Sequence, residues 1–344
     1  MKIRVFLGTG GVGKTSVAAA AALQAALDGD KCLVLTIDPA LRLRTALQLK
    51  PGKGQQKVPL DSFSTKGELW AAMLDVGATL NRAVQLYSKQ EQADVVLKHP
   101  IYQLLVASLA GLPELLAIER LDQALKDGFN TIVVDTAPSR HAFEFLDKPE
   151  FFVQLVSFPV VQLVGRTYKW WERSPLSKLS RKSLELYSRV ESLLGATLVR
   201  QILDFYSVFF NIAEGYADRA THSASLLRDP RTTAFCIVTT PLKADRDGEY
   251  FLRELKKRRF PVKSLIMNRI WPPLESSLSP DGPPLMQQAV EWYRDVSVAH
   301  QRAWEKAQHE FGNRIPKLIR VPELTQDIDG LEALHRITQS IGET

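Results

Sequence analysis

The sequence contains few cysteines and no long apolar run. Its 344 residues contain two cysteines, Cys32 and Cys236, each within an apolar stretch and neither in a CxxC pair. This argues against a disulfide framework or a thiolate metal site, and favours a reducing compartment. No run reaches the roughly 18 apolar residues of a membrane-spanning helix, and the nearest, residues 151–165, contains two glutamines. The first apolar stretch leads directly into glycines, unlike a secretory signal. We therefore expect a cytoplasmic protein.

Strong charge of one sign is also missing. The chain has 44 basic and 38 acidic residues, a net charge of +6, and its basic residues are dispersed apart from 256–259. This distribution provides no dense nucleic-acid-binding tail, so we expect no nucleic-acid partner. The six histidines show no metal-ligand spacing. Hydrophobic residues make up 45% of the chain, which is sufficient for a large globular core.

Short apolar stretches alternate with helical patterns along most of the chain. A strand, a glycine loop, a helix and a second strand in the first 37 residues form a βαβ unit. The whole pattern predicts an α/β fold, a mainly parallel sheet flanked by helices, as a single domain over 1–344. Two helical insertions are expected, at 65–127 and 150–228. Strands are predicted at 3–7, 32–37, 131–134, 233–238, 262–267 and 317–321, and helices at 15–27, 247–257, 285–311 and 328–341.

Residues 8–15 carry the strongest chemical signal. Their sequence, Gly-Thr-Gly-Gly-Val-Gly-Lys-Thr, matches GxxxxGK[ST] between a predicted strand and a predicted helix. Glycines let backbone N–H groups converge on phosphate oxygens, and the helix N-terminus favours negative charge. Lys14 is expected to reach the β- and γ-phosphates, and Thr15 to ligate Mg²⁺. The predicted ATP-binding residues here are Gly8, Gly10, Gly11, Val12, Gly13, Lys14, Thr15 and Ser16.

Two carboxylates stand at the ends of predicted strands, where open α/β sheets place ligand chemistry. Asp135 follows the strand at 131–134 and is the natural Walker-B residue, acting on Mg²⁺ through water. Asp38 follows the strand at 32–37 and precedes Pro39. The residues alone leave two interpretations of Asp38 open, a functional carboxylate and a turn cap.

An ordered set of segments resembles the arsenite-pump (ArsA-type) ATPase family, which includes the ATPase that targets tail-anchored membrane proteins. The segments span nearly the whole chain: 8–15, Thr-Ile-Asp-Pro-Ala at 36–40, 111–121, Asp-Thr-Ala-Pro-Ser-Arg-His at 135–141, 143–149, 238–241, Met-Asn-Arg at 267–269 and 321–324. The resemblance implies a deviant-Walker P-loop ATPase whose dimer opens and closes to handle a client. It further implies that Asp38 orients the attacking water and is catalytic together with Lys14. Asp135 then begins switch II, Asn268 reads the adenine, and Pro322 lies in the adenine-stacking loop.

The sequence departs from that family at its signature residue and in its client-binding features. The family carries a lysine that reaches the partner subunit's phosphates, and here that position is Thr9. The chain therefore resembles a bacterial-looking variant, acting as a homodimer or as a heterodimer with a paralogue that keeps the lysine. Two cysteines cannot supply a three-thiolate arsenite site. Four methionines and the lack of a CxxC pair also differ from the eukaryotic targeting ATPases.

Several functional alternatives remain open from the sequence. The first is an ATPase that binds ATP and ADP and handles a client, with a membrane protein as one candidate. A P-loop kinase would need an acceptor pocket, for which no signature is found, and a slow or non-catalytic ATP-binding scaffold fits Thr9. The apolar residues of 151–164 form either a client groove or a core helix. Trp170 and Trp171, among basic residues, favour either peripheral attachment to a membrane surface or an ordinary solvated face.

Overall fold

The computed structural model describes residues 2–37, 42–50, 54–87, 123–137, 225–274 and 283–342, with isolated positions between 93 and 121 and at 221–222. The chain divides into two compact units. The first comprises Met1–Leu74, Gln123–Phe143 and Ser225–Thr344 and holds the sheet. The second comprises Asp75–Asp122 and Glu144–Ala224. The features predicted at 138–141, 151–164 and 170–171 lie outside the described residues.

In the second unit, the described structure is chiefly helix α3 (Val76–Tyr87). The Asp75 carboxylate accepts a hydrogen bond of 3.0 Å from the N–H of Ala78. This contact satisfies one of the otherwise unpaired N–H groups of the first turn, which explains where α3 begins.

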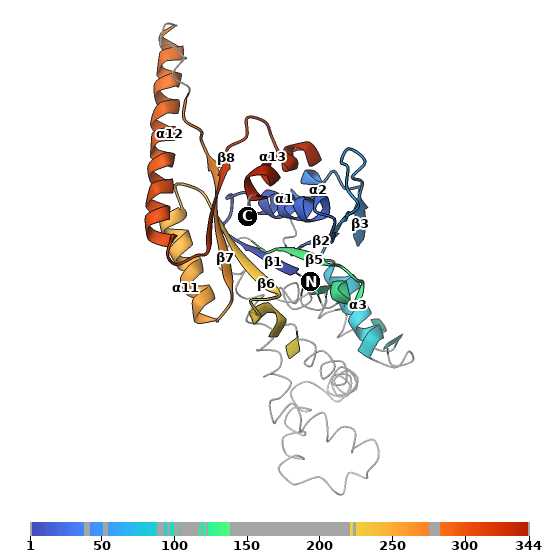
Figure 1. The fold of residues 1–344 in the computed structure, drawn as a ribbon. Helices are drawn as coiled ribbons and strands as arrows, with labels where there is room; N and C mark the ends of the chain where they lie inside the picture. The colour runs from blue at the N-terminus through green and yellow to red at the C-terminus, as the bar shows by residue number, and fades with distance from the viewer. Residues whose placement is uncertain are drawn as a thin grey trace, which may run out of the picture. The chain divides into compact units, whose positions relative to one another are not determined.

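The first unit is built on an eight-stranded sheet in the order β3-β4-β2-β5-β1-β6-β7-β8 (Figure 1). Every neighbouring pair is parallel except β3 and β4. The predicted α/β class with a mainly parallel sheet is confirmed. The strands are β1 (Lys2–Leu7), β2 (Lys31–Thr36), β3 (Gln55–Val58), β4 (Glu68–Met73), β5 (Thr131–Asp135), β6 (Thr233–Thr239), β7 (Val262–Ile270) and β8 (Lys317–Pro322).

Strands β3 and β4 correct one sequence prediction. Residues 68–73 were expected inside the helical insertion at 65–127, but they form β4, paired in parallel with β2. Leucine, alanine and methionine are good helix formers, so intrinsic propensity misleads here. Burial of Leu69 and Ala71 in the sheet outweighs that preference. The antiparallel edge strand β3, which pairs with β4, carried no recognised sequence signal.

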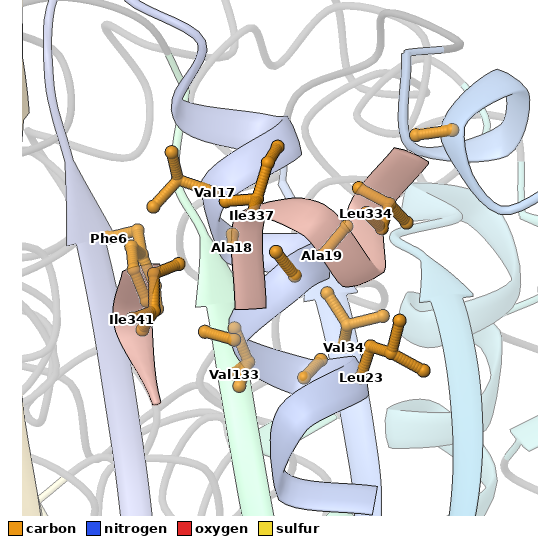
Figure 2. Close-up of a cluster of buried hydrophobic side chains, with 14 of the residues drawn as sticks. Phe6, Val17, Ala18, Ala19, Leu23, Val34, Val133, Leu334, Ile337 and Ile341 are labelled. Carbon is orange, nitrogen blue, oxygen red and sulfur yellow. The ribbon is translucent and has the colours of Figure 1, made fainter. Parts of the chain in front are cut away.

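Helix α1 (Lys14–Leu27) connects the glycine loop to the core. Seven alanines bring its backbone close to the sheet, and eleven of its fourteen residues are buried. Helix α13 (Leu331–Ile341) covers its other side. Figure 2 shows side chains of α1 packed among those of the sheet and of α13, which holds α1 in the core. The labelled side chains are Phe6, Val34 and Val133 of the sheet, Val17, Ala18, Ala19 and Leu23 of α1, and Leu334, Ile337 and Ile341 of α13.

The other helices of the first unit lie around the two ends of the sheet. Helix α2 (Arg42–Ala46) contacts α1. A π-helical turn, η2 (Ala244–Gly248), follows β6 and continues into α11 (Glu249–Lys257). The long helix α12 (Pro284–Phe311) contacts β7, β8 and η2. Within the described part of the chain, no helix combines the length and apolar character that a membrane span requires.

Candidate functional site

The loop between β1 and α1 is shaped by two tight backbone approaches. Gly13 is the N-cap of α1 in the left-handed conformation, with φ of 80°. A Cβ at Gly13 would lie 2.2 Å from the Asn268 amide nitrogen, and one at Gly8 would lie 2.5 Å from the Val238 carbonyl oxygen. No side chain caps α1, and its first turn contains no acidic residue. The N–H groups at this helix end therefore remain suited to an external anion.

A buried ion pair stands behind this loop. The Lys14 ammonium lies 2.6 Å from Oδ1 of Asp135, and the two side chains are 5% and 0% exposed. Lys14 also donates to the Thr136 carbonyl oxygen, and the Thr36 hydroxyl donates to the other Asp135 oxygen at 3.0 Å. The carboxyl ends of β2 and β5 and the start of α1 thus share one network. Removal of either charge would leave the other buried and unpaired.

A cavity of ≈ 600 Å³ opens in front of the loop. Thr15 and Ser16 line one side of it together with Lys14, and Arg42 and Arg269 line other parts. None of the described residues that line it is acidic. Three cations and the free N-terminus of α1 make the cavity suitable for phosphate groups.

A second cavity, of ≈ 360 Å³, adjoins the first and shares Gly13, Ser16 and Arg269 with it. Asn268 and Pro322 line this second cavity, as expected if both face the same ligand. Asn268 is 5% exposed and donates a hydrogen bond of 2.9 Å from its amide nitrogen to the Val12 carbonyl oxygen. Its amide therefore holds the glycine loop in place and also borders the cavity.

Lys14, Thr15 and Ser16 line the larger cavity, and Asn268 and Pro322 line the smaller one. The other described loop residues differ in their surroundings. The Gly10 carbonyl accepts a hydrogen bond from Lys243, Val12 is fully buried, and Gly11 lines the larger cavity. Asp38 and its neighbours up to residue 41 lie outside the described residues. The water-orienting role of Asp38 therefore stays a prediction.

Two polar contacts between η2 and the glycine loop were missed by the sequence analysis. The Thr9 hydroxyl donates a hydrogen bond of 2.6 Å to Asp247, a carboxylate that is 5% exposed. The Lys243 ammonium donates to the Gly10 carbonyl oxygen at 2.9 Å. Asp247 was interpreted only as the start of a helix. Its position after β6, at the edge of the sheet where the glycine loop lies, was the signal that could have identified Asp247 as a partner of the loop.

The residues present fit a magnesium-bound nucleotide. Thr15 provides a hydroxyl in the phosphate cavity, and Asp135 provides a carboxylate whose present partner is the lysine of the same loop. Hydroxyl and carboxylate oxygens are the donors that Mg²⁺ takes in such sites. The two adjoining cavities provide separate volumes for phosphates and base.

Comparison with known proteins agrees with this geometry. The family model described as "Anion-transporting ATPase" matches residues 1–343. The protein named ATPase GET3 from Rhodotorula glutinis is 25% identical over 333 residues, covering 96% of this chain and 84% of the relative. Two Arabidopsis thaliana proteins, ATPase GET3B and ATPase GET3C, are each 27% identical, over 296 and 289 residues. Each match covers 78% of this chain, and 64% and 67% of the respective relative.

Proposed function

Because this chain belongs to the anion-transporting ATPase (ArsA) family, we propose that it is a Mg²⁺-dependent ATPase that couples ATP binding and hydrolysis to a conformational change. The observation that supports this most strongly is the buried Lys14–Asp135 pair, which lies behind a positively lined cavity. A non-catalytic glycine turn would not require a desolvated lysine–carboxylate pair at that position.

In this proposal each described group has one task. The N–H groups of the loop and Lys14 bind the phosphates in the larger cavity, where Arg42 and Arg269 add positive charge. The base occupies the smaller cavity beside Asn268 and Pro322. Mg²⁺ would be held by the Thr15 hydroxyl and, through water, by Asp135, and would neutralise charge on the phosphate oxygens. Asp38 orients the attacking water.

The ion pair also suggests how ATP binding is transmitted. In this structure Lys14 is bound to Asp135 and to the carbonyl of Thr136. On ATP binding, Lys14 exchanges these partners for phosphate oxygens. Both partners stand at the end of β5, and the family's switch II begins there. The exchange therefore links occupation of the loop to the segment after Asp135.

The client and assembly are proposed from the resemblance to the ArsA-type family. We propose an ATPase that works as a dimer in the cytoplasm on a membrane-protein client. Residues 150–228 are the proposed client or partner region of a single-domain protein with two insertions. Arsenite is not the proposed cargo. Cys32 and Cys236 are buried, burial raises the pKa of both thiols, and neither lines the two nucleotide cavities.

A second candidate is a slow or non-catalytic ATP-binding subunit, either alone or in a heterodimer with a paralogue. Thr9 favours it, because its hydroxyl is bound to Asp247 of the same chain. Position 9 is thereby tied to η2, whereas the family's lysine at that position extends to a partner's phosphates.

The main test compares Lys14→Ala with Lys57→Ala. Lys57 is a half-exposed lysine of the edge strand β3 and serves as the control. At ATP concentrations of one hundred times Kd, binding should stabilise the wild-type protein by about 2.7 kcal/mol. We expect both this stabilisation and phosphate release to be lost in Lys14→Ala and kept in Lys57→Ala. Thermal unfolding with and without Mg·ATP measures the stabilisation, and a phosphate assay measures the release.

The variant Asp38→Asn separates binding from hydrolysis. It should keep the ATP-induced stabilisation and lose phosphate release, because water orientation acts mainly in the transition state. An ATP-induced shift that persists in Lys14→Ala would contradict the whole assignment. A wild-type protein that is stabilised by ATP but releases no phosphate would select the non-catalytic alternative.

Thr9→Lys tests the assembly, with Thr9→Val as the control that removes the hydroxyl without adding charge. A cation supplied across an interface can raise phosphoryl-transfer rates by roughly 10³–10⁵. If this charge is what a homodimer of the chain lacks, Thr9→Lys should gain ATP-dependent dimerisation and faster turnover, and Thr9→Val should gain neither. Light scattering and phosphate release measure both effects. A folded Thr9→Lys protein without either gain would end the heterodimer argument.

A further inference from the structure

A third cavity, of ≈ 510 Å³, lies at the opposite edge of the sheet from the glycine loop. It is formed by residues near the amino ends of β1, β6, β7 and β8, together with parts of α1 and α13. Among the described residues, it shares no lining residue with either proposed nucleotide cavity. The cavity therefore has its own chemistry, which the proposed ATPase activity does not use.

The charge lining this cavity has one sign. Lys2, Arg4, Arg231, Lys263 and Lys317 all line it, and none of its described lining residues is acidic. The Arg231 guanidinium donates two hydrogen bonds to the Asp229 carboxylate. The described wall of the cavity contains no carboxylate.

Arg4 is the central cation of this group. It lies on β1 in the middle of the sheet, opposite Val133 of β5 and Ala234 of β6. The guanidinium is close enough to Cys32 and Cys236 to lower the pKa of both thiols, although burial raises each pKa by more. Within the described part of the chain, Arg4 makes neither a hydrogen bond nor an ion pair. The Asp30 carboxylate raises the pKa of Cys32. It accepts a hydrogen bond from the Thr131 hydroxyl and does not line the cavity.

The inner wall of the cavity is apolar. Phe6, Ile266, Ile319 and Ile341 line it, and each is at most 6% exposed. Phe6 and Ile341 belong to the same buried cluster, which Figure 2 shows, and both line the cavity. A charged group can therefore approach Arg4 while an apolar group covers this wall.

We propose that this cavity is a binding site for a small amphipathic anion. Its carboxylate or phosphate pairs with Arg4, and its apolar body packs against Phe6, Ile319 and Ile341. The guanidinium of Arg4 has no hydrogen-bond or ion-pair partner among the described residues, and an anion with hydrogen-bonding oxygens would pair with it. An inorganic anion would leave the apolar wall in water, and a neutral hydrophobe would leave Arg4 unpaired. The cavity volume is in the range of small-molecule sites.

The test is a calorimetric titration of the full chain below the micelle concentration of each probe. The probes are octanoate and octyl phosphate, with 1-octanol and inorganic phosphate as the apolar-only and charge-only comparisons. All four are titrated into the wild-type protein and into Lys14→Ala, which removes the phosphate-binding cation of the other site. We expect octanoate or octyl phosphate to bind one to one, about tenfold or more tightly than either comparison, in both proteins. Which of the two binds more tightly identifies the head group.

Arg4→Gln should weaken that binding by about tenfold or more, because hydrogen bonds to a charged group are lost. Arg253→Gln, at an exposed arginine of α11 outside the cavity, should leave it unchanged. If Arg4→Gln does not fold, the rim variant Lys2→Gln/Lys263→Gln replaces it, with weakening of several-fold expected. Any one of four results would overturn the proposal. These are equally tight binding of 1-octanol, equally tight binding of inorganic phosphate in Lys14→Ala, unchanged affinity in the folded charge variants, and no binding at millimolar concentration. Loss of ATP binding in Lys14→Ala with octanoate binding intact would support both sites separately.

Discussion

The cations at the two edges of the sheet have opposite surroundings. At the carboxyl edge, Lys14 is bound to Asp135, and Asn268 is bound to the glycine loop. At the amino edge, the half-buried Arg4 faces a cavity whose described lining residues include no acidic side chain. A ligand at the first edge must compete with partners that the protein provides, whereas one at the second edge would supply the missing partner. The first arrangement suits a switch, and the second suits a simple binding site.

The largest expected effect comes from removing each cation in the absence of ligand. Lys14→Met should lower the free energy of unfolding by about 3–5 kcal/mol, because Asp135 is then buried without its counter-charge. Arg4→Met should change it by less than about 1 kcal/mol, or raise it, since no described partner is lost. Urea unfolding of the ligand-free variants measures both values. Similar losses in the two variants would show that Arg4 has a partner and that the edges do not differ in this way.

A second test concerns the backbone that holds the paired edge in position. Gly13→Ala should cost about 1–3 kcal/mol and weaken ATP binding, because its φ is positive and the added Cβ would meet the Asn268 amide. Gly10→Ala is the matched control for stability in the same loop. Its Cβ meets nothing within 4 Å, and its φ is not positive. Thermal unfolding without ATP distinguishes the two. Equal behaviour of the two alanine variants would show that the loop is not held by this contact.

The smallest expected effect is a pH dependence at His300, another polar group at the carboxyl edge with a partner inside the protein. His300 is 8% exposed, and its Nδ1 accepts the N–H of Trp271 at 3.2 Å. Burial lowers the pKa of His300 below its ordinary value of 6.5. The unfolded chain then binds the proton more readily, so the contribution of His300 to stability is full above about pH 6.5 and is lost as the pH falls below it.

The variant His300→Gln tests this sign, because glutamine can accept the same N–H but does not titrate. Between pH 7.5 and 5.5, the wild-type protein should lose stability relative to His300→Gln by on the order of 1 kcal/mol or less. His309→Gln, an exposed position on the same helix, should follow the wild-type curve. The measurement is urea unfolding across the pH series. A wild-type protein that gained stability relative to His300→Gln on acidification would contradict the assignment.

The sequence predicted the parts of the fold that depend on local pattern. The glycine loop, the alanine-rich helix after it and the strand before it were recognisable because consensus spacing and apolar periodicity agree over the first 37 residues. The strand β4 was missed because its leucine, alanines and methionine favour a helix in isolation. Pairing with β2 decided its conformation, and that pairing joins segments more than thirty residues apart.

By itself, the sequence determined which chemical groups are available at the proposed nucleotide site. A lysine, a threonine and strand-end carboxylates at those positions have few other uses, and their identities do not depend on the rest of the fold. The tertiary structure alone decided which partner each group has. Thr9 is bound to Asp247, 238 residues away in the sequence, and Arg4 stands beside a cavity built from four strands and two helices. Burial and long-range pairing depend on how distant segments pack, and a linear pattern carries no record of that packing.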